Sequence, residues 1–231
     1  MDCKFLLSAG VSLVTIFLFS CSSSGGIEDK SSSSSVIACS GIEYNPYSHY
    51  CFEGEIIAKG EITDARDGKV YKVVTIYNQT WMAENLNYNV SGSRCYDDEP
   101  VNCEIYGRLY EWKLAMGACP QGWHLPSEDE WRELLTMVWV NNLRSINYWR
   151  YSEEHEKTDS YGFSALPGGV KWPDHWGSEL FHDIGIYGIW WHSSVFDGYD
   201  TGSTISIRPN SMKFSEIGAP LGYMVSVRCV E

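Results

Sequence analysis

Two tryptophans in a polar segment have the residue types and spacing of a recognition surface. Trp172 and Trp176 flank Pro173-Asp174-His175 in a stretch that lacks helix or strand periodicity, which predicts a surface loop. Aromatic rings can stack on sugar faces while carboxylates bind the hydroxyls. We therefore expect Trp172, Asp174 and Trp176, with Asp197 further along the chain, to form a ligand-binding site. The alternative is that the two rings only cover the domain's own edge.

Other reactive side chains do not predict a catalytic or metal site. Tyr148, Trp149 and Tyr151 form a second aromatic candidate of the same kind, in an earlier polar stretch. The six histidines are scattered, and the carboxylates near Asp174 and Asp197 are fewer than the six to eight oxygens that calcium takes. We find no nucleophile elbow and no phosphate-binding loop. We expect a non-enzyme without a metal or cofactor.

The charge balance excludes one class of partner. The chain has 30 acidic and 17 basic residues, a net charge of -13. Binding to a phosphate backbone needs clustered Lys and Arg, which are absent here. We expect no nucleic-acid partner.

The first 20 residues have the pattern of an export signal. Lys4 precedes the apolar run FLLSAGVSLVTIFLF, which is too short to span a membrane comfortably. The run ends at Leu18-Phe19-Ser20-Cys21, which resembles the lipobox of bacterial lipoproteins. That resemblance implies cleavage before Cys21 and acylation of its thiol, and Ser22 favours delivery to the outer membrane or cell surface. An ordinary signal peptide with an incidental cysteine is the alternative.

Six cysteines remain after Cys3 and Cys21 are set aside. An even number in an oxidising compartment predicts three disulfides, although six cysteines allow 15 pairings. Nearest-neighbour pairing favours two short loops and leaves one long one. The expected pairs are Cys39–Cys51, Cys95–Cys103 and Cys119–Cys229.

Composition divides the chain into four parts. The signal peptide covers residues 1–20, and the lipidated Cys21 begins a Ser-rich tether that extends to residue 38. Residues 39–55 are expected to form a small disulfide-closed lobe, and residues 56–231 the main domain.

The pattern of the main domain predicts two helices and several strands. β-branched alternation over 69–76 predicts a strand, followed by a turn at Asn78-Gln79 and a strand over 80–83. Apolar spacing predicts helices over 106–117 and 128–140. The second begins at a capping box of Ser127 and Glu130. Short strands are expected over 163–170, 187–195, 203–208, 212–214 and 222–230, which indicates an α+β fold with an antiparallel sheet.

Several segments in order resemble the Fibrobacter succinogenes major paralogous domain family. They cover most of the exported part of the chain and include a GWHLP segment. They are TDARDGKVYKVVTIYNQTWMAENLNY (63–88), CYDDEPVNCEIYG (95–107), YGRLYEWKLAMGACPQGWHLPSEDEW (106–131), GFSALPGG (162–169), GIWWHSS (188–194) and VSVRCV (225–230).

The same order of features is similar to the C-type lectin-like and sulfatase-modifying-factor folds. The resemblance implies a C-type lectin-like α+β fold of two helices and short antiparallel strands. It also implies that Cys119, before the GWHLP segment, pairs with Cys229 in the last strand. We expect a membrane-anchored surface lipoprotein whose non-catalytic module binds carbohydrate such as plant cell wall polysaccharide. The alternative is a structural or protein-interaction lipoprotein of the envelope.

Overall fold

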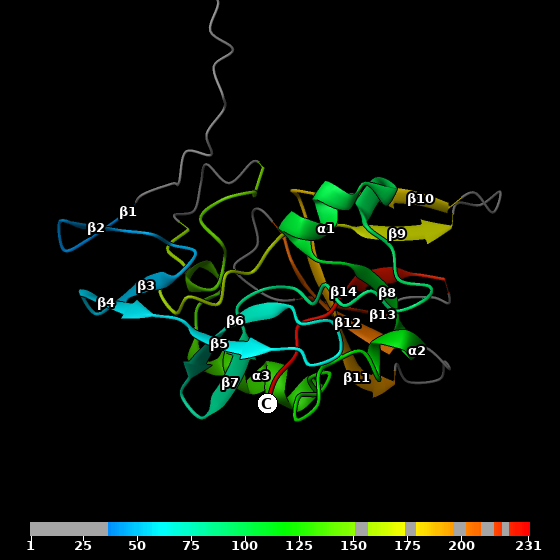
Figure 1. Cartoon of the computed structure of the whole chain (residues 1–231), viewed down its shortest axis with the longest axis horizontal. Coiled ribbons are helices and arrows are strands. Elements are labelled where there is room, and N and C mark those ends of the chain that lie inside the picture. Colours follow the sequence, from blue (N-terminus) through cyan, green and yellow to red (C-terminus); the bar gives the residue numbers. More distant parts are fainter. Residues whose placement is uncertain (1–36, 151–156, 174–178, 196–201, 209–214, 219–221) are drawn as a thin grey trace, which may run out of the picture. The chain divides into compact units, whose positions relative to one another are not determined.

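The computed structural model of the chain describes residues 37–150, 157–173, 179–195, 202–208, 215–218 and 222–231 (Figure 1). These residues form a mixed α+β unit with few helices, several small sheets and three disulfides, which confirms the α+β class. The expected signal peptide and Cys21 lie outside the described residues. Within the described ranges, no helix is both long and apolar enough to cross a membrane.

Two short hairpins begin the described chain. Each two-residue loop has both residues at positive φ, Ser40-Gly41 in the first and Glu53-Gly54 in the second, as in the turns that suit a twisted hairpin. The Cys39–Cys51 disulfide joins the hairpins. Their strands are β1 (Ile37–Cys39), β2 (Ile42–Tyr44), β3 (His49–Phe52) and β4 (Glu55–Ala58).

A three-stranded antiparallel sheet follows, in the order β5-β6-β7. The strand expected over 69–76 is confirmed. The turn after it lies one residue earlier than expected, at Tyr77-Asn78, because Ile76 pairs with Gln79. The strands are β5 (Gly60–Thr63), β6 (Val70–Ile76) and β7 (Gln79–Met82).

Helix α3 (Glu128–Met137) confirms the second predicted helix and its start. The Ser127 side chain accepts from the amide of Glu130, whose carboxylate in turn accepts from the amide of Ser127. The helix lies beside β7 (Figure 1), where the Gln79 amide donates to the backbone oxygen of Glu130 at 3.1 Å. Its buried face includes Trp131, whose ring centroid lies 4.7 Å from that of Trp81.

The prediction of one helix over residues 106–117 is wrong. The segment is divided between the end of α1 (Pro100–Tyr106), the strand β8 (Leu109–Glu111) and the one-turn helix α2 (Trp112–Ala115). Met116, near the end of the segment, is exposed.

Gly107 explains where α1 ends. Its backbone has φ 75°, in the left-handed region that favours glycine. A Cβ here would lie 2.8 Å from the backbone oxygen of Asn85, so only glycine fits without displacement. The chain then leaves the helix, and Leu109–Glu111 pairs with β14 instead. Tertiary pairing therefore overrides the local helical spacing.

The largest sheet among the described residues has seven strands, in the order β10-β9-β14-β11-β12-β13, with β8 pairing β14. On the face of this sheet that packs into the core, the ring centroid of Trp190 lies 6.0 Å from that of Trp131. The segment expected as a strand over 163–170 contributes only Val170, at which β9 begins. The strands are β9 (Val170–Pro173), β10 (Glu179–His182), β11 (Gly188–Val195), β12 (Gly202–Ile207), β13 (Ser215–Gly218) and β14 (Met224–Ser226).

Two short 3-10 helices complete the described elements, η1 (Tyr96–Asp98) and η2 (Val140–Asn142). All three expected disulfides are confirmed, namely Cys39–Cys51, Cys95–Cys103 and Cys119–Cys229. Because disulfides persist in oxidising compartments, they indicate an extracytoplasmic protein.

Candidate functional site

Trp172 lies in a strand rather than in the expected loop. It belongs to β9 and pairs with Leu180 of β10, so the backbone around it is held by an antiparallel ladder. Its side chain is half-buried. The other three residues expected at this site, Asp174, Trp176 and Asp197, lie outside the described residues.

The Trp172 ring stands between two other rings. The His182 ring is stacked on it, with centroids 4.2 Å apart and an interplanar angle of 11°. The Tyr223 ring, from the residue just before the strand that begins at Met224, is stacked as well, with its centroid 5.5 Å from that of Trp172 and an interplanar angle of 23°. His182 is two residues beyond Leu180, a diagonal neighbour on the same face of the sheet, which brings the rings together. The indole is therefore fixed in orientation by aromatic neighbours.

A pocket of about 230 Å³ opens on this face of the sheet. Alternate residues of β12 and the residue after it, Thr204, Ser206 and Arg208, face the pocket, whereas Ile205 and Ile207 pack into the core on the opposite face. This is the period of two that a strand imposes. We call this space the Trp172 pocket. It is lined by Val170, Trp172, Asp183, Tyr187, Ile189, Thr204, Ser206, Arg208, Tyr223 and Val225.

The pocket combines apolar walls with groups of both charges. Arg208 is exposed, and its guanidinium carbon lies 5.5 Å from the centroid of the Tyr187 ring. Asp183 begins the turn after β10, where its backbone oxygen accepts from the amide of Tyr187 at 3.0 Å. Hydroxyls, a carboxylate and a guanidinium thus surround an aromatic wall. In the part of the chain that is described, no group of three or more metal-binding side chains comes together.

Trp149 of the second aromatic candidate does not lie on the surface. Trp149 is buried in the core, and its indole nitrogen donates to the backbone oxygen of Ala165 at 2.9 Å. Tyr148 is exposed, while Tyr151 lies outside the described residues. The prediction of a shared aromatic surface is therefore wrong for Trp149.

Sequence reasoning missed most of the wall of the Trp172 pocket. The alternation of Thr204, Ser206 and Arg208 between buried isoleucines is visible in the sequence and indicates a polar face. No local pattern, however, indicates that Tyr223 meets Trp172, because they are neighbours only through the pairing of β9 with β14.

One family model matches the chain, described as the Fibrobacter succinogenes major domain, over residues 74–231. No curated protein and no solved structure matches it. The match covers more than half of the sequence and includes every described residue of the Trp172 pocket. The chain therefore belongs to the Fibrobacter succinogenes major domain family.

Proposed function

We propose that the Trp172 pocket is a non-catalytic binding site for carbohydrate, and that the protein presents it at the cell surface. The main support for this proposal is the Trp172 indole, which is stacked on Tyr223 and lines a pocket together with Tyr187. Hydroxyl, carboxylate and guanidinium groups line the same pocket. Sugar rings offer apolar C–H faces and many hydroxyls, so they match both kinds of wall.

The geometry suits a short saccharide segment of a polymer. A volume of about 230 Å³ is below the usual range for drug-sized ligands, so the pocket accommodates one ring at a time. We propose plant cell wall polysaccharides, which expose repeating neutral rings, as the class of ligand. A C-type lectin-like arrangement of the α+β fold is part of the same proposal.

Replacing Trp172 by alanine is expected to weaken binding of xylo- or cello-oligosaccharides strongly. Loss of an aromatic hot spot costs about 2 kcal/mol or more, which corresponds to roughly a 30-fold rise in Kd. Isothermal titration of the purified full chain measures this change.

Trp139→Ala provides the matched control. Trp139 has 69% of its surface exposed and does not line the pocket, so its removal is expected to leave Kd unchanged. Equal losses in the two variants, or a wild-type chain that binds no polysaccharide, would contradict the proposal. The latter result would favour the structural or protein-interaction lipoprotein instead.

Anchoring by a lipid on Cys21 is a second part of the proposal and rests on the lipobox-like sequence. Several acyl chains give stable attachment, because each buried methylene contributes ~0.8 kcal/mol. Cys21→Ser is expected to move the protein from the membrane fraction to the soluble exported fraction. Immunoblotting of fractionated cells measures the distribution. A variant that stays in the membrane fraction contradicts the lipid anchor.

A further inference from the structure

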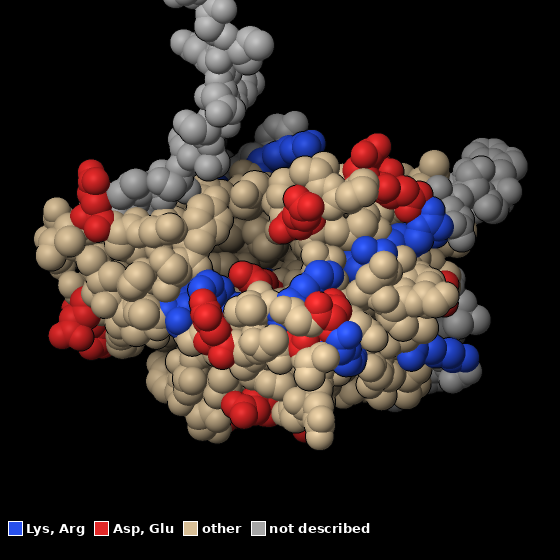
Figure 2. Space-filling model, viewed as in Figure 1, with Lys and Arg blue, Asp and Glu red and all other residues tan. Residues whose placement is uncertain are grey.

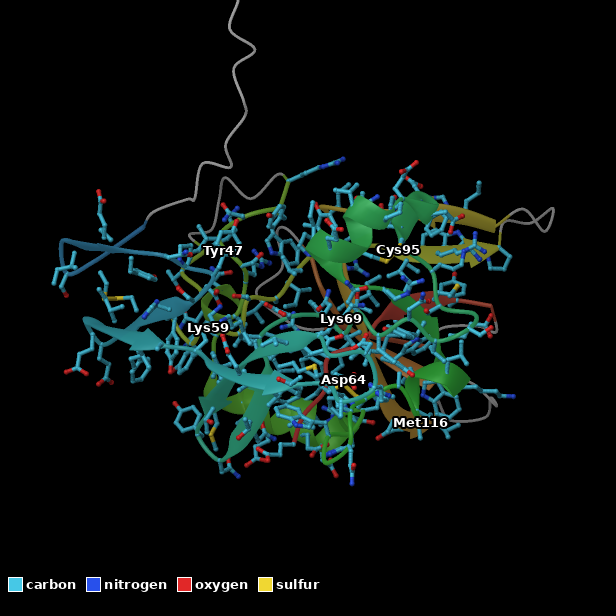
Figure 3. All side chains as sticks on the ribbon, in the orientation of Figure 1. Tyr47, Lys59, Asp64, Lys69, Cys95 and Met116 are labelled. Atoms are coloured by element: carbon cyan, nitrogen blue, oxygen red, sulfur yellow. A yellow bond between two sulfur atoms is a disulfide. The ribbon has the colours of Figure 1, made fainter. Side chains whose placement is uncertain are left out.

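A second cavity, of about 450 Å³, lies away from the Trp172 pocket and shares none of its lining residues. Figure 2 shows a hollow on the viewed face with acidic and basic side chains around it. Tyr47 and Lys59 come from the N-terminal hairpin region (Figure 3), and Glu84, Asp159 and Ser164 come from the family domain. This cavity is within the usual size range of small-molecule sites.

A chain of hydrogen bonds crosses the cavity wall. The Lys59 ammonium donates to Ser164 Oγ at 2.7 Å, and Ser164 Oγ donates to Asp159 Oδ2 at 2.6 Å. The other carboxylate oxygen of Asp159 accepts from the Ser164 amide at 2.7 Å. One hydroxyl therefore lies between a cation and a carboxylate, both of which are almost fully buried.

The loop that holds this hydroxyl is strained. Asp159 and Ser164 have φ of 44° and 52°, a region that non-glycine residues rarely adopt. Such conformations cluster at functional sites, where the surrounding structure enforces them. Here Arg228 fixes the loop, because its guanidinium donates to the backbone oxygens of Phe163 and Ser164 at 2.9 and 3.1 Å.

We infer that Ser164 is a nucleophile for hydrolysis of a small carboxylic ester in this cavity, with Asp159 as general base and Lys59 as the cation that stabilises developing negative charge. A nucleophile within hydrogen-bond reach of its base, on the wall of a cavity, is the arrangement that acyl transfer needs.

The proposed reaction balances through Asp159. Ser164 Oγ attacks the ester carbonyl carbon while its proton passes to Asp159. The carbon–oxygen bond to the alcohol then breaks, and Asp159 returns the proton to the departing alkoxide. Water attacks the acyl-serine, giving its proton to Asp159, which passes it to Ser164 as the carboxylic acid leaves. Ester and water thus become acid and alcohol.

The electrostatic surroundings place the base in a useful range. Burial raises the pKa of Asp159 to about 6, although Lys59, the hydrogen bonds from Ser164 and the charge of Arg228 all act to lower it. The pKa of Tyr44 is raised by burial and also by the nearby charge of Asp159. General bases work best when their pKa is near the operating pH. Because only the ionised carboxylate accepts a proton, turnover is expected to rise as pH increases through about 6.

The test uses the purified full chain with a fluorophosphonate probe and with p-nitrophenyl acetate. The probe is expected to modify Ser164, as mapped by peptide mass spectrometry on the wild-type protein. Ser164→Ala is expected to abolish labelling, and Asp159→Asn to lower ester turnover about 100-fold. Ser160→Ala is the matched control, because Ser160 lies in the same loop but its hydroxyl donates to Thr158.

Absence of labelling at Ser164 in the folded wild-type protein overturns the inference, as does ester turnover equal to that of Ser164→Ala. Site mapping on wild type keeps this test independent of how well the variants fold. A turnover that does not change between pH 5 and 7 also overturns the assignment of Asp159 as base. None of these measurements depends on whether the Trp172 pocket binds carbohydrate.

Discussion

Replacing Cys119 and Cys229 together by alanine is expected to lower the free energy of unfolding by ~4–5 kcal/mol, from the loop entropy released in the unfolded chain. The disulfide closes a loop with a sequence separation of 110 residues. Cys229 is fully buried beside Val230, whose backbone pairs with both Trp81 and His124, so the bond also fixes the chain's last segment. Urea denaturation followed by tryptophan fluorescence measures the change.

The pair Cys39 and Cys51 is the matched control. It encloses a separation of only 12 residues, for which the same chain-entropy argument gives about 3 kcal/mol. Removing it is therefore expected to cost clearly less than removing Cys119–Cys229. If the two double variants lose the same stability, loop length does not govern the stabilisation. A loss below ~1 kcal/mol for Cys119–Cys229 would contradict its role as the main covalent constraint.

Arg228→Met is expected to destabilise the protein by ~3–5 kcal/mol, the cost of removing one partner from a buried charged network. Arg228 is fully buried and donates to backbone oxygens of Met82, Phe163 and Ser164 and to the Asn85 side chain. Methionine fills the space but removes the guanidinium donor from all four acceptors, and Asn85 Oδ1 keeps only the indole N–H of Trp190. Urea unfolding of the purified full chain measures the loss.

Two further variants test why arginine is needed. Arg228→Lys is expected to recover little stability, because an ammonium cannot reproduce the fork that reaches Phe163 and Asn85 together. Arg132→Met, on the exposed face of α3, removes a surface pair with Glu128 and is expected to cost less than ~1 kcal/mol. Full recovery in Arg228→Lys would show that charge alone, rather than hydrogen-bond geometry, is what the core requires.

Local rules predicted the elements whose causes are local. The start of α3 was predictable because the capping box satisfies its first amides within four residues, Ser127 to Glu130. Strand β6 was predictable because it is rich in β-branched residues, and in its second half the buried Val74 and Ile76 alternate with the exposed Thr75. The two short disulfides followed from the even count and from proximity along the chain, and Cys119–Cys229 was the pair left over.

Elements fixed by distant partners were not predictable in this way. Leu109 and Trp112 have helical spacing, yet Leu109 pairs with Ser226, more than a hundred residues later. The apolar spacing of a segment does not indicate which distant strand pairs with it. Gly107, which ends α1 at a close approach to Asn85, was a local sign against a helix that begins at residue 106.

The residues of the two proposed sites also differ in whether their sequence neighbourhood could indicate them. Trp172 could be selected from its sequence neighbourhood, but its contact with Tyr223 depends on sheet order. Lys59 and Ser164 are separated by 105 residues, and neither belongs to a catalytic motif, so the expectation of no enzyme followed naturally from sequence alone. Only the folded chain joins the Lys59 ammonium, the Ser164 hydroxyl and the Asp159 carboxylate by hydrogen bonds.

The larger cavity crosses the border of the shared domain. The family match begins at residue 74, whereas Tyr47 and Lys59 precede it. The cation of this cavity and part of its rim therefore come from a segment that the family match does not cover. A chain with the same matched segment and an uncharged residue at position 59 would lack the ammonium that donates to Ser164.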